Sequence, residues 1–126
     1  MILAACLVVT FDVGGFVGAR ADMVRAIRAA DGCVVIDGDC LSSCTMFLAL
    51  GDAVCVTDRA RLFFHGPRGA FGEPLPPHLF DHWSGVMAQH YPGPIGPWFL
   101  AKGRFGESWV DAGELMRLGV APCTWA

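Results

Sequence analysis

The sequence predicts an α/β fold: one domain, residues 1–126, in which a parallel sheet is linked by crossover helices. Continuous apolar runs rich in Val, Leu and Ile at 2–11 and 33–36 are typical of strands buried on both faces. The stretch between them has the periodicity of an amphipathic helix. With 54% hydrophobic and 17% charged residues, the chain has the composition of a packed core and not of a disordered segment.

The first half of the chain follows a strand–helix–strand order. The strand at 2–11 ends in the glycine turn "DVGG", and a helix is expected at 17–30 because its apolar side chains fall on one face. "DG" ends that helix, and a second strand occupies 33–36. After the turn "DGDC", Ser42 or Ser43 is suited to cap a helix that runs to about residue 50.

The second half is expected to begin with strands at 53–56 and 60–64, the latter ending at His65. A Gly/Pro-rich loop covers 66–77, and helices are expected at about 78–90 and 95–103, separated by prolines that prevent continuation. A last helix fits 111–118, with Gly119 as its stop signal. Glu107 falls in the loop before it, and Asp111 suits its N-cap.

Charge and cysteine content limit the class of protein. The formal charge is −3 and no Lys/Arg stripe is present, which excludes nucleic-acid binding. A mean hydropathy of +0.48 indicates an apolar surface reserved for a partner, a pocket or a membrane face. The six cysteines form no C-x-x-C pair and favour an oxidising compartment with one or two disulfides; the alternative is a set of small buried thiols in a reducing cell.

Two further clusters have plain structural interpretations. His78 and His82 are spaced i, i+4 on an expected helix, a spacing that can bind zinc, but no third ligand is evident and a surface pair is favoured. We therefore predict no metal and no cofactor. Four large apolar residues after the loop are expected in the core or as a cover over a cleft: Trp83, Met87, Trp98 and Phe99.

Three features point to one edge of the sheet. Ser42 and Ser43 lie where a strand opens a helix, His65 ends a later strand, and Gly14-Gly15 forms a turn after the first strand. Carboxyl ends of parallel strands share an edge, where sites collect. Each feature also has a structural explanation, namely a helix cap, a strand-end histidine and an ordinary turn. Their order and spacing together favour a nucleophile, a base and oxyanion donors.

The order "DVGG … DGDCLSSCTMFLALGDAVCV … ARLFFHGP" resembles the proteolytic subunit of the Clp protease and, more broadly, the Clp/crotonase-like family with its signal-peptide-peptidase-like members. The resemblance covers about residues 8–65, and more weakly 104–121. It implies Ser42 as nucleophile, His65 as base and Glu107 as the triad acid, with Asp111 as a nearby alternative acid. The N–H groups of Gly15 and Ser43 would then form the oxyanion hole.

The chain also departs from this family. Cys44 stands where the family has a glycine, and a disulfide with Cys40 would brace the loop. The segment 66–106 is shorter than the family's long handle helix, so the fold is expected in a truncated form without ATPase partners. A small group of bacterial proteins, predicted to be periplasmic, resembles this chain most specifically.

The leading hypothesis is a serine hydrolase that acts as a peptidase on a peptide or protein substrate in the bacterial periplasm or cell envelope. The alternative is a catalytically inactive binding module that kept the fold and a disulfide-braced loop. An acyl-handling enzyme of crotonase type would require a nucleotide cleft that the sequence does not indicate. The apolar composition is compatible with membrane association and with homo-oligomerisation.

Overall fold

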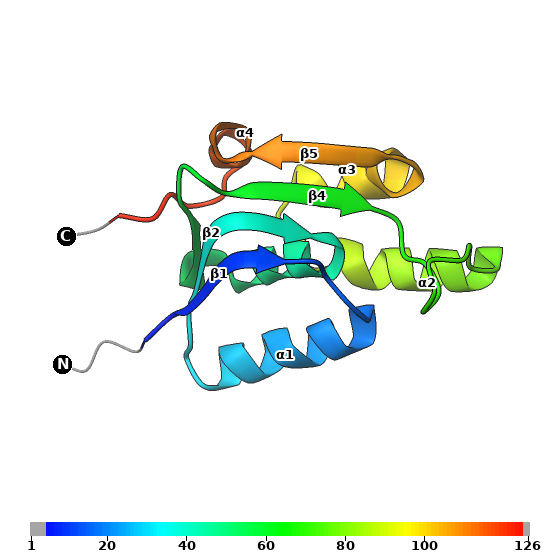
Figure 1. Ribbon diagram of the computed structural model, residues 1–126, viewed down its shortest axis with the longest axis horizontal. Helices are drawn as coiled ribbons and strands as arrows, with labels where there is room; N and C mark the ends of the chain where they lie inside the picture. The colour runs from blue at the N-terminus through cyan, green and yellow to red at the C-terminus, as the bar shows by residue number, and fades with distance from the viewer. Residues whose placement is uncertain (1–4, 125–126) are drawn as a thin grey trace.

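The computed structural model describes residues 5–124, which form five strands and several helices. The strands make one mixed sheet in the order β1-β2-β4-β5, and β3 pairs with the first part of β2 (Figure 1). All pairs are parallel except β4 with β5, which is antiparallel. The bounds are β1 Leu7–Asp12, β2 Val34–Leu41, β3 Val54–Val56, β4 Arg61–His65 and β5 Glu107–Asp111.

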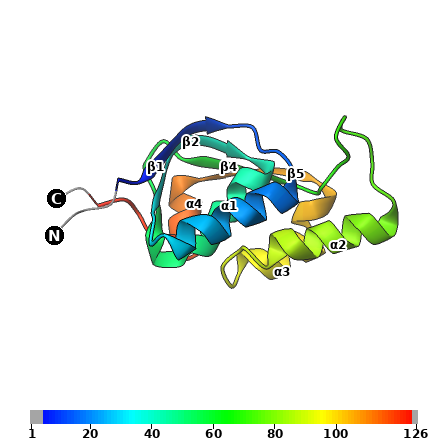
Figure 2. The same cartoon turned by 90° about the horizontal axis from the view of Figure 1, so that it is seen from below.

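The helices lie on one side of this sheet. Figure 2 shows α1, α2, α3 and α4 together on that side. The α-helices are α1 Val17–Ala29, α2 Pro77–Ala88, α3 Ile95–Ala101 and α4 Ala112–Arg117; two 3₁₀ segments are η1 Ser42–Ala53 and η2 Gly103–Phe105. The core fills the space between these helices and the sheet, and Phe47, Phe64 and Phe99 are its largest fully buried side chains.

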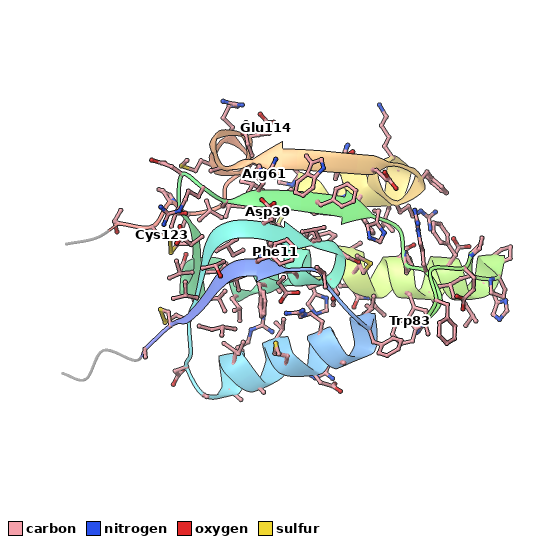
Figure 3. All side chains as sticks on the ribbon, in the orientation of Figure 1. Phe11, Asp39, Arg61, Trp83, Glu114 and Cys123 are labelled. Atoms are coloured by element: carbon pink, nitrogen blue, oxygen red, sulfur yellow. A yellow bond between two sulfur atoms is a disulfide. The ribbon has the colours of Figure 1, made fainter. Side chains whose placement is uncertain are left out.

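The opposite face of the sheet carries no helix in the described chain. Asp39 and Arg61 form a bidentate ion pair across β2 and β4 on this face, and Arg61 also lies 4.6 Å from the Trp109 ring centroid. Figure 3 shows Phe11, Asp39 and Arg61 side by side across the strands. Because this face has no covering helix within residues 5–124, the expectation of burial on both faces is wrong for the run at 2–11, whose strand β1 is largely exposed. It is confirmed for the run at 33–36 at Val34, Val35 and Ile36, three consecutive residues that are all buried.

The sheet differs from the predicted one in three places. β2 continues through the expected turn "DGDC" to Leu41, where it pairs with β4. β1 is an edge strand, so Leu7, Val8 and Phe11 are exposed although the run is continuously apolar. Glu107, expected in a loop, begins the antiparallel strand β5. The predicted strand at 2–11 lies partly outside the described residues, in 2–4.

All six cysteines are paired, in the disulfides Cys6–Cys33, Cys40–Cys44 and Cys55–Cys123. The prediction of one or two disulfides was too low, whereas the prediction that Cys40 and Cys44 brace their loop agrees with this pairing. Three disulfides indicate an oxidising, extracytoplasmic compartment, because reducing compartments keep thiols unpaired. Within residues 5–124, no helix is long and apolar enough to cross a membrane.

Candidate active site

Ser42, His65 and Gly15 line one cleft of about 710 Å³ at the carboxyl ends of β1, β2 and β4. The cleft lies between the start of α1, the strand ends and the loop 66–76. Its walls include Val13, Phe16, Leu75 and Trp83, and Figure 3 places Trp83 where α1 and α2 approach each other. The shared sheet edge predicted from the sequence thus brings these three residues to one hollow of the surface.

Ser42 has a backbone conformation that serine rarely adopts. Its φ is +57°, in the left-handed region, at the point where β2 ends and η1 begins. Such a conformation costs about 1–3 kcal/mol and persists only where surrounding contacts enforce it. The N-cap of η1 is Leu41, and no side chain caps the helix. The prediction that Ser42 or Ser43 caps this helix is therefore wrong.

The Ser42 hydroxyl is accordingly not engaged in holding its own helix. Within residues 5–124, no hydrogen bond is formed by Ser42 Oγ, and none links it to His65. Ser43 is fully buried and its Oγ has no hydrogen-bond partner in the described chain. The two serines thus differ: Ser42 opens onto the cleft, whereas Ser43 faces inward and can contribute only its backbone N–H there.

Two devices hold the Ser42 backbone in place. Thr45 Oγ1 donates a hydrogen bond of 2.6 Å to the Ser42 carbonyl and lies 2.6 Å from Tyr91 Oη. The disulfide Cys40–Cys44 joins the end of β2 to η1 and spans Ser42, and both of its residues are fully buried. Burial raises the pKa of Tyr91 well above its usual range, so this hydroxyl stays protonated and available to the network.

The glycine turn "GG" packs directly against this junction. Gly14 has φ +97°, and a Cβ placed on it would lie 2.8 Å from the Ser42 Cβ and 2.9 Å from the Leu41 carbonyl oxygen. Gly15 has φ +145° and faces open space, and its N–H has no hydrogen-bond partner within residues 5–124. Only glycine combines such a close approach with these angles. Gly15 therefore contributes an unpaired donor to the cleft that Ser42 also lines.

A partly buried ion pair orients the turn. Asp12 accepts a hydrogen bond of 2.8 Å from the Gly14 N–H and two bonds, of 2.9 and 3.0 Å, from Arg20. Arg20 is only 9% exposed and lies 4.8 Å from the centroid of the Phe47 ring. Neither residue of this pair was predicted to belong to the site. Asp12 two residues before a glycine is typical of an Asx turn, which is the signal that could have found it.

His65 has one ring nitrogen already engaged. Its Nδ1 lies 2.7 Å from the Gly66 carbonyl oxygen, at the end of β4. Because a carbonyl can only accept, Nδ1 must carry the proton in the neutral ring, which leaves Nε2 as an acceptor. A histidine in this tautomer can accept a proton at Nε2. In triads an acidic side chain usually holds Nδ1–H, and here a main-chain carbonyl does so.

Glu107 lies beside His65 but contacts a different residue. The two are cross-strand neighbours in the β4–β5 pair, yet within residues 5–124 no hydrogen bond or ion pair links their side chains. Glu107 instead pairs with Arg68 at 3.5 Å and lines a second cleft of about 490 Å³. The loop 66–76 separates the two clefts and contributes to the lining of both. Asp111, the alternative acid, caps α4 by accepting from the Glu114 N–H, as predicted.

Comparison of the sequence with models of known protein families gives no match, and comparison with curated proteins gives none either. The assignment of this site therefore depends on its own geometry.

Proposed function

We propose that this protein is a serine hydrolase that cleaves peptide bonds, with Ser42 as nucleophile and His65 as general base. The observation that carries the proposal is the state of Ser42 at the end of β2. Its backbone is strained, its side chain does not cap η1, and it lines the same cleft as His65. A helix cap or a structural serine would need neither the left-handed backbone nor an opening onto the cleft. The cost of holding that conformation supports a functional role.

The proposed reaction follows acyl-transfer chemistry. Ser42 Oγ attacks the substrate carbonyl while His65 Nε2 accepts the hydroxyl proton and then delivers it to the leaving amine. The oxyanion is held by the N–H groups of Gly15 and Ser43, and water then hydrolyses the acyl-enzyme. The Gly66 carbonyl keeps the imidazole in the required tautomer. In the described chain Ser42 and His65 form no hydrogen bond, and bonds of this kind often form only when substrate is bound.

The walls of the cleft favour a substrate with an apolar side chain. Val13, Phe16, Leu75 and Trp83 provide apolar surface, and Arg68 is the one basic residue among the lining side chains apart from His65. Arg68 is suited to pair with a carboxylate on the substrate, in competition with Glu107. The three disulfides support activity outside the cytoplasm, and we place the protein in the bacterial periplasm or cell envelope.

A relation to the Clp/crotonase-like family is part of this proposal. The glycine turn, the serine at the end of β2 and the histidine at the end of β4 occur in the family's order. Glu107, which the resemblance assigns to the acid, is positioned across from His65 but paired with Arg68. The proposal therefore gives the orienting role to the Gly66 carbonyl, and Glu107 remains a secondary candidate.

Fluorophosphonate labelling of the oxidised protein, read by peptide mass spectrometry, tests the proposal. We expect one adduct, on Ser42, that disappears in Ser42→Ala and His65→Ala. Ser43→Ala is a matched control, because its hydroxyl bonds to nothing in the described chain and its N–H is retained. His90→Ala matches His65, because His90 Nδ1 also contacts a main-chain carbonyl, at 2.7 Å, outside the cleft. Both controls should keep the adduct.

An absence of adduct in protein shown to be folded would contradict the proposal. The catalytically inactive binding module would then be the better explanation, supported by the missing Ser42–His65 hydrogen bond. An adduct that persists in His65→Ala at an unchanged rate would exclude His65 as the base but not Ser42 as the nucleophile.

A further inference from the structure

A groove along the free edge of β5 is separate from the proposed active site. β5 is the last strand of the sheet, and among the described strands its one partner is β4. A cavity of about 390 Å³ is lined by its residues Ser108, Trp109 and Val110. Figure 1 shows β5 at the border of the sheet, with α4 at its end. The cleft that holds Ser42 and His65 shares none of the residues that line this groove.

The lining residues place the groove at the strand edge. Ser108 is the cross-strand neighbour of Phe64, which is buried beneath the helices, whereas Trp109 packs on Phe63, with ring centroids 4.7 Å apart. Successive side chains of a strand point to opposite faces. A cavity lined by three consecutive residues of one strand therefore lies along the edge of that strand, beside its main chain. No hydrogen bond joins the backbone there to any described segment other than β4.

The far wall of the groove is apolar. Ile95 and Trp98 of α3 contribute to it, together with Leu118 at the end of α4. Trp98 is held edge-on against Phe64, with ring centroids 5.5 Å apart, so this wall is preformed. A cavity of this size lies within the range of small-ligand sites and can hold one or two apolar side chains.

The one charge that lines the groove is negative and belongs to Glu114. The acidic residues at the two ends of β5 are engaged elsewhere, since Glu107 pairs with Arg68 and Asp111 caps α4. Arg117 pairs with Glu114 but is 71% exposed, so a ligand cation can compete for the carboxylate. Figure 3 shows Glu114 on α4, near the end of β5. A basic side chain is therefore the complementary charge for an occupant.

We propose that this groove binds an extended, basic–apolar peptide segment of a partner protein, which pairs with the free edge of β5 as an additional strand. Unpaired main-chain groups provide affinity in such sites, and side-chain pockets provide specificity. An apolar side chain of the peptide fills the space between Trp98 and Leu118, and a Lys or Arg faces Glu114. This binding is independent of the proposed hydrolase activity and does not require Ser42.

The test uses a library of capped heptapeptides in which apolar residues alternate with polar ones and one polar position is Lys. Binding is followed by the fluorescence change of Trp98 and Trp109 and by calorimetry. We expect members with dissociation constants on the order of micromolar, a value typical of a small interface. A proline at the central polar position removes a main-chain donor and should weaken binding at least about tenfold. Lys→Glu in the peptide should also weaken it.

Protein variants distinguish the groove from other surfaces. Leu118→Asp places a charge in the apolar wall and should abolish binding, whereas Leu79→Asp, an exposed position of α2, should not. Glu114→Gln is a milder change, and it should reduce the preference for Lys over Glu peptides without loss of fold. Ser42→Ala should bind the peptides as tightly as the unaltered protein does. The outcome of the peptide-binding test is therefore independent of the outcome of the hydrolase test.

Three results would overturn the proposal. The first is that no library member binds to the folded protein. The second is that proline-containing peptides bind as well as their parents, or that Leu118→Asp and Glu114→Gln bind normally. The third is that the protein dimerises as its concentration rises and Leu118→Asp prevents this, which would make a second copy of the chain the occupant of the groove.

Discussion

The end of β2 and the end of β4 supply the two main residues of the proposed site, and the chain holds them in different ways. Ser42, after β2, is fixed by a buried disulfide, by Thr45 and Tyr91, and by the close approach of Gly14. His65, at the end of β4, is oriented by the carbonyl of its own neighbour and is followed by the loop 66–76, which is mostly exposed from residue 68 onward. The tip of that loop carries Phe71, which is 96% exposed.

This contrast shows that the fold fixes the position of Ser42 with more contacts than it uses for His65. The strained serine needs contacts from several elements, because a left-handed backbone relaxes unless its surroundings prevent it. The histidine needs only a fixed tautomer and ring direction, and one local hydrogen bond provides both. Substitutions around β2 should therefore alter Ser42 reactivity strongly, whereas substitutions beyond β4 should alter it little.

The largest effect is expected from Gly14→Ala. Its Cβ would meet the Ser42 side chain and the Leu41 carbonyl while φ stays at +97°. Overpacking and backbone strain of this kind each cost about 1–3 kcal/mol. Denaturant unfolding should show the loss of stability, and fluorophosphonate labelling of Ser42 should fall with it. Gly15→Ala is the control for stability, because its Cβ would enter open space and only the strain remains. Equal losses of stability in the two variants would contradict this account of the turn.

Two of the disulfides are expected to affect different properties, namely the positioning of Ser42 and the stability of the fold. Cys40→Ala with Cys44→Ala opens a link of sequence separation 4, worth about 2 kcal/mol by chain entropy, whereas Cys55→Ala with Cys123→Ala opens one of separation 68, worth about 4 kcal/mol. We expect the first pair of substitutions to lower the labelling rate more, up to about 10²-fold, because it releases Ser42. The second should lower the melting temperature more. A larger loss of labelling on removal of the long-range disulfide than on removal of Cys40–Cys44 would contradict the proposal that Cys40–Cys44 positions Ser42.

Tyr91 gives a prediction about pH. It is the single tyrosine of the chain, and burial raises its pKa above the ordinary 10.0. In the unfolded chain the phenol loses its proton near that pH, whereas in the folded chain it keeps it. Unfolding therefore releases a proton, and stability falls as the pH rises above about 10. Tyrosinate absorbance should follow unfolding, and Tyr91→Phe should lack this part of the pH dependence.

Tyr91→Phe should also cost about 1 kcal/mol at neutral pH, because Thr45 loses a buried hydrogen-bond partner. Labelling of Ser42 should slow measurably, since Thr45 also holds the Ser42 carbonyl. Thr45→Ser, which retains the hydroxyl, is the matched control and should label faster than Thr45→Val. An identical labelling rate in all three variants would show that the network does not position Ser42.

The smallest effects are expected beyond β4. Glu107→Gln should change the labelling rate by less than about tenfold, because the Gly66 carbonyl already holds His65. Loss of an essential triad acid would instead cost about 10⁴-fold. Phe71→Ser, at the loop tip, should leave stability within about 0.5 kcal/mol of the unaltered protein. A drop of 10³-fold or more in Glu107→Gln would restore Glu107 to the role that the resemblance implies.

Features encoded by neighbouring residues were predicted better than features that depend on distant parts of the chain. The helix at 17–30 and the N-cap at Asp111 were predicted well, since periodicity and capping are encoded within a few residues. The end of β2 was predicted five residues early, because Asp37, Gly38 and Asp39 have the composition of a turn. Pairing with β1 and β4 overrides that local preference. The strand β5 was missed because its five residues lack a continuous apolar run.

The α/β class, the oxidised state suggested by six cysteines, and the grouping of Ser42, His65 and Gly15 at one sheet edge could be predicted without the structure. Those features depend on composition and on the order of strands and turns along the chain. The tertiary structure decided which cysteines pair, that β1 and β5 are edges, and that Tyr91 reaches Thr45 across 46 residues. These depend on strand register and helix packing, which bring together groups that no local pattern relates.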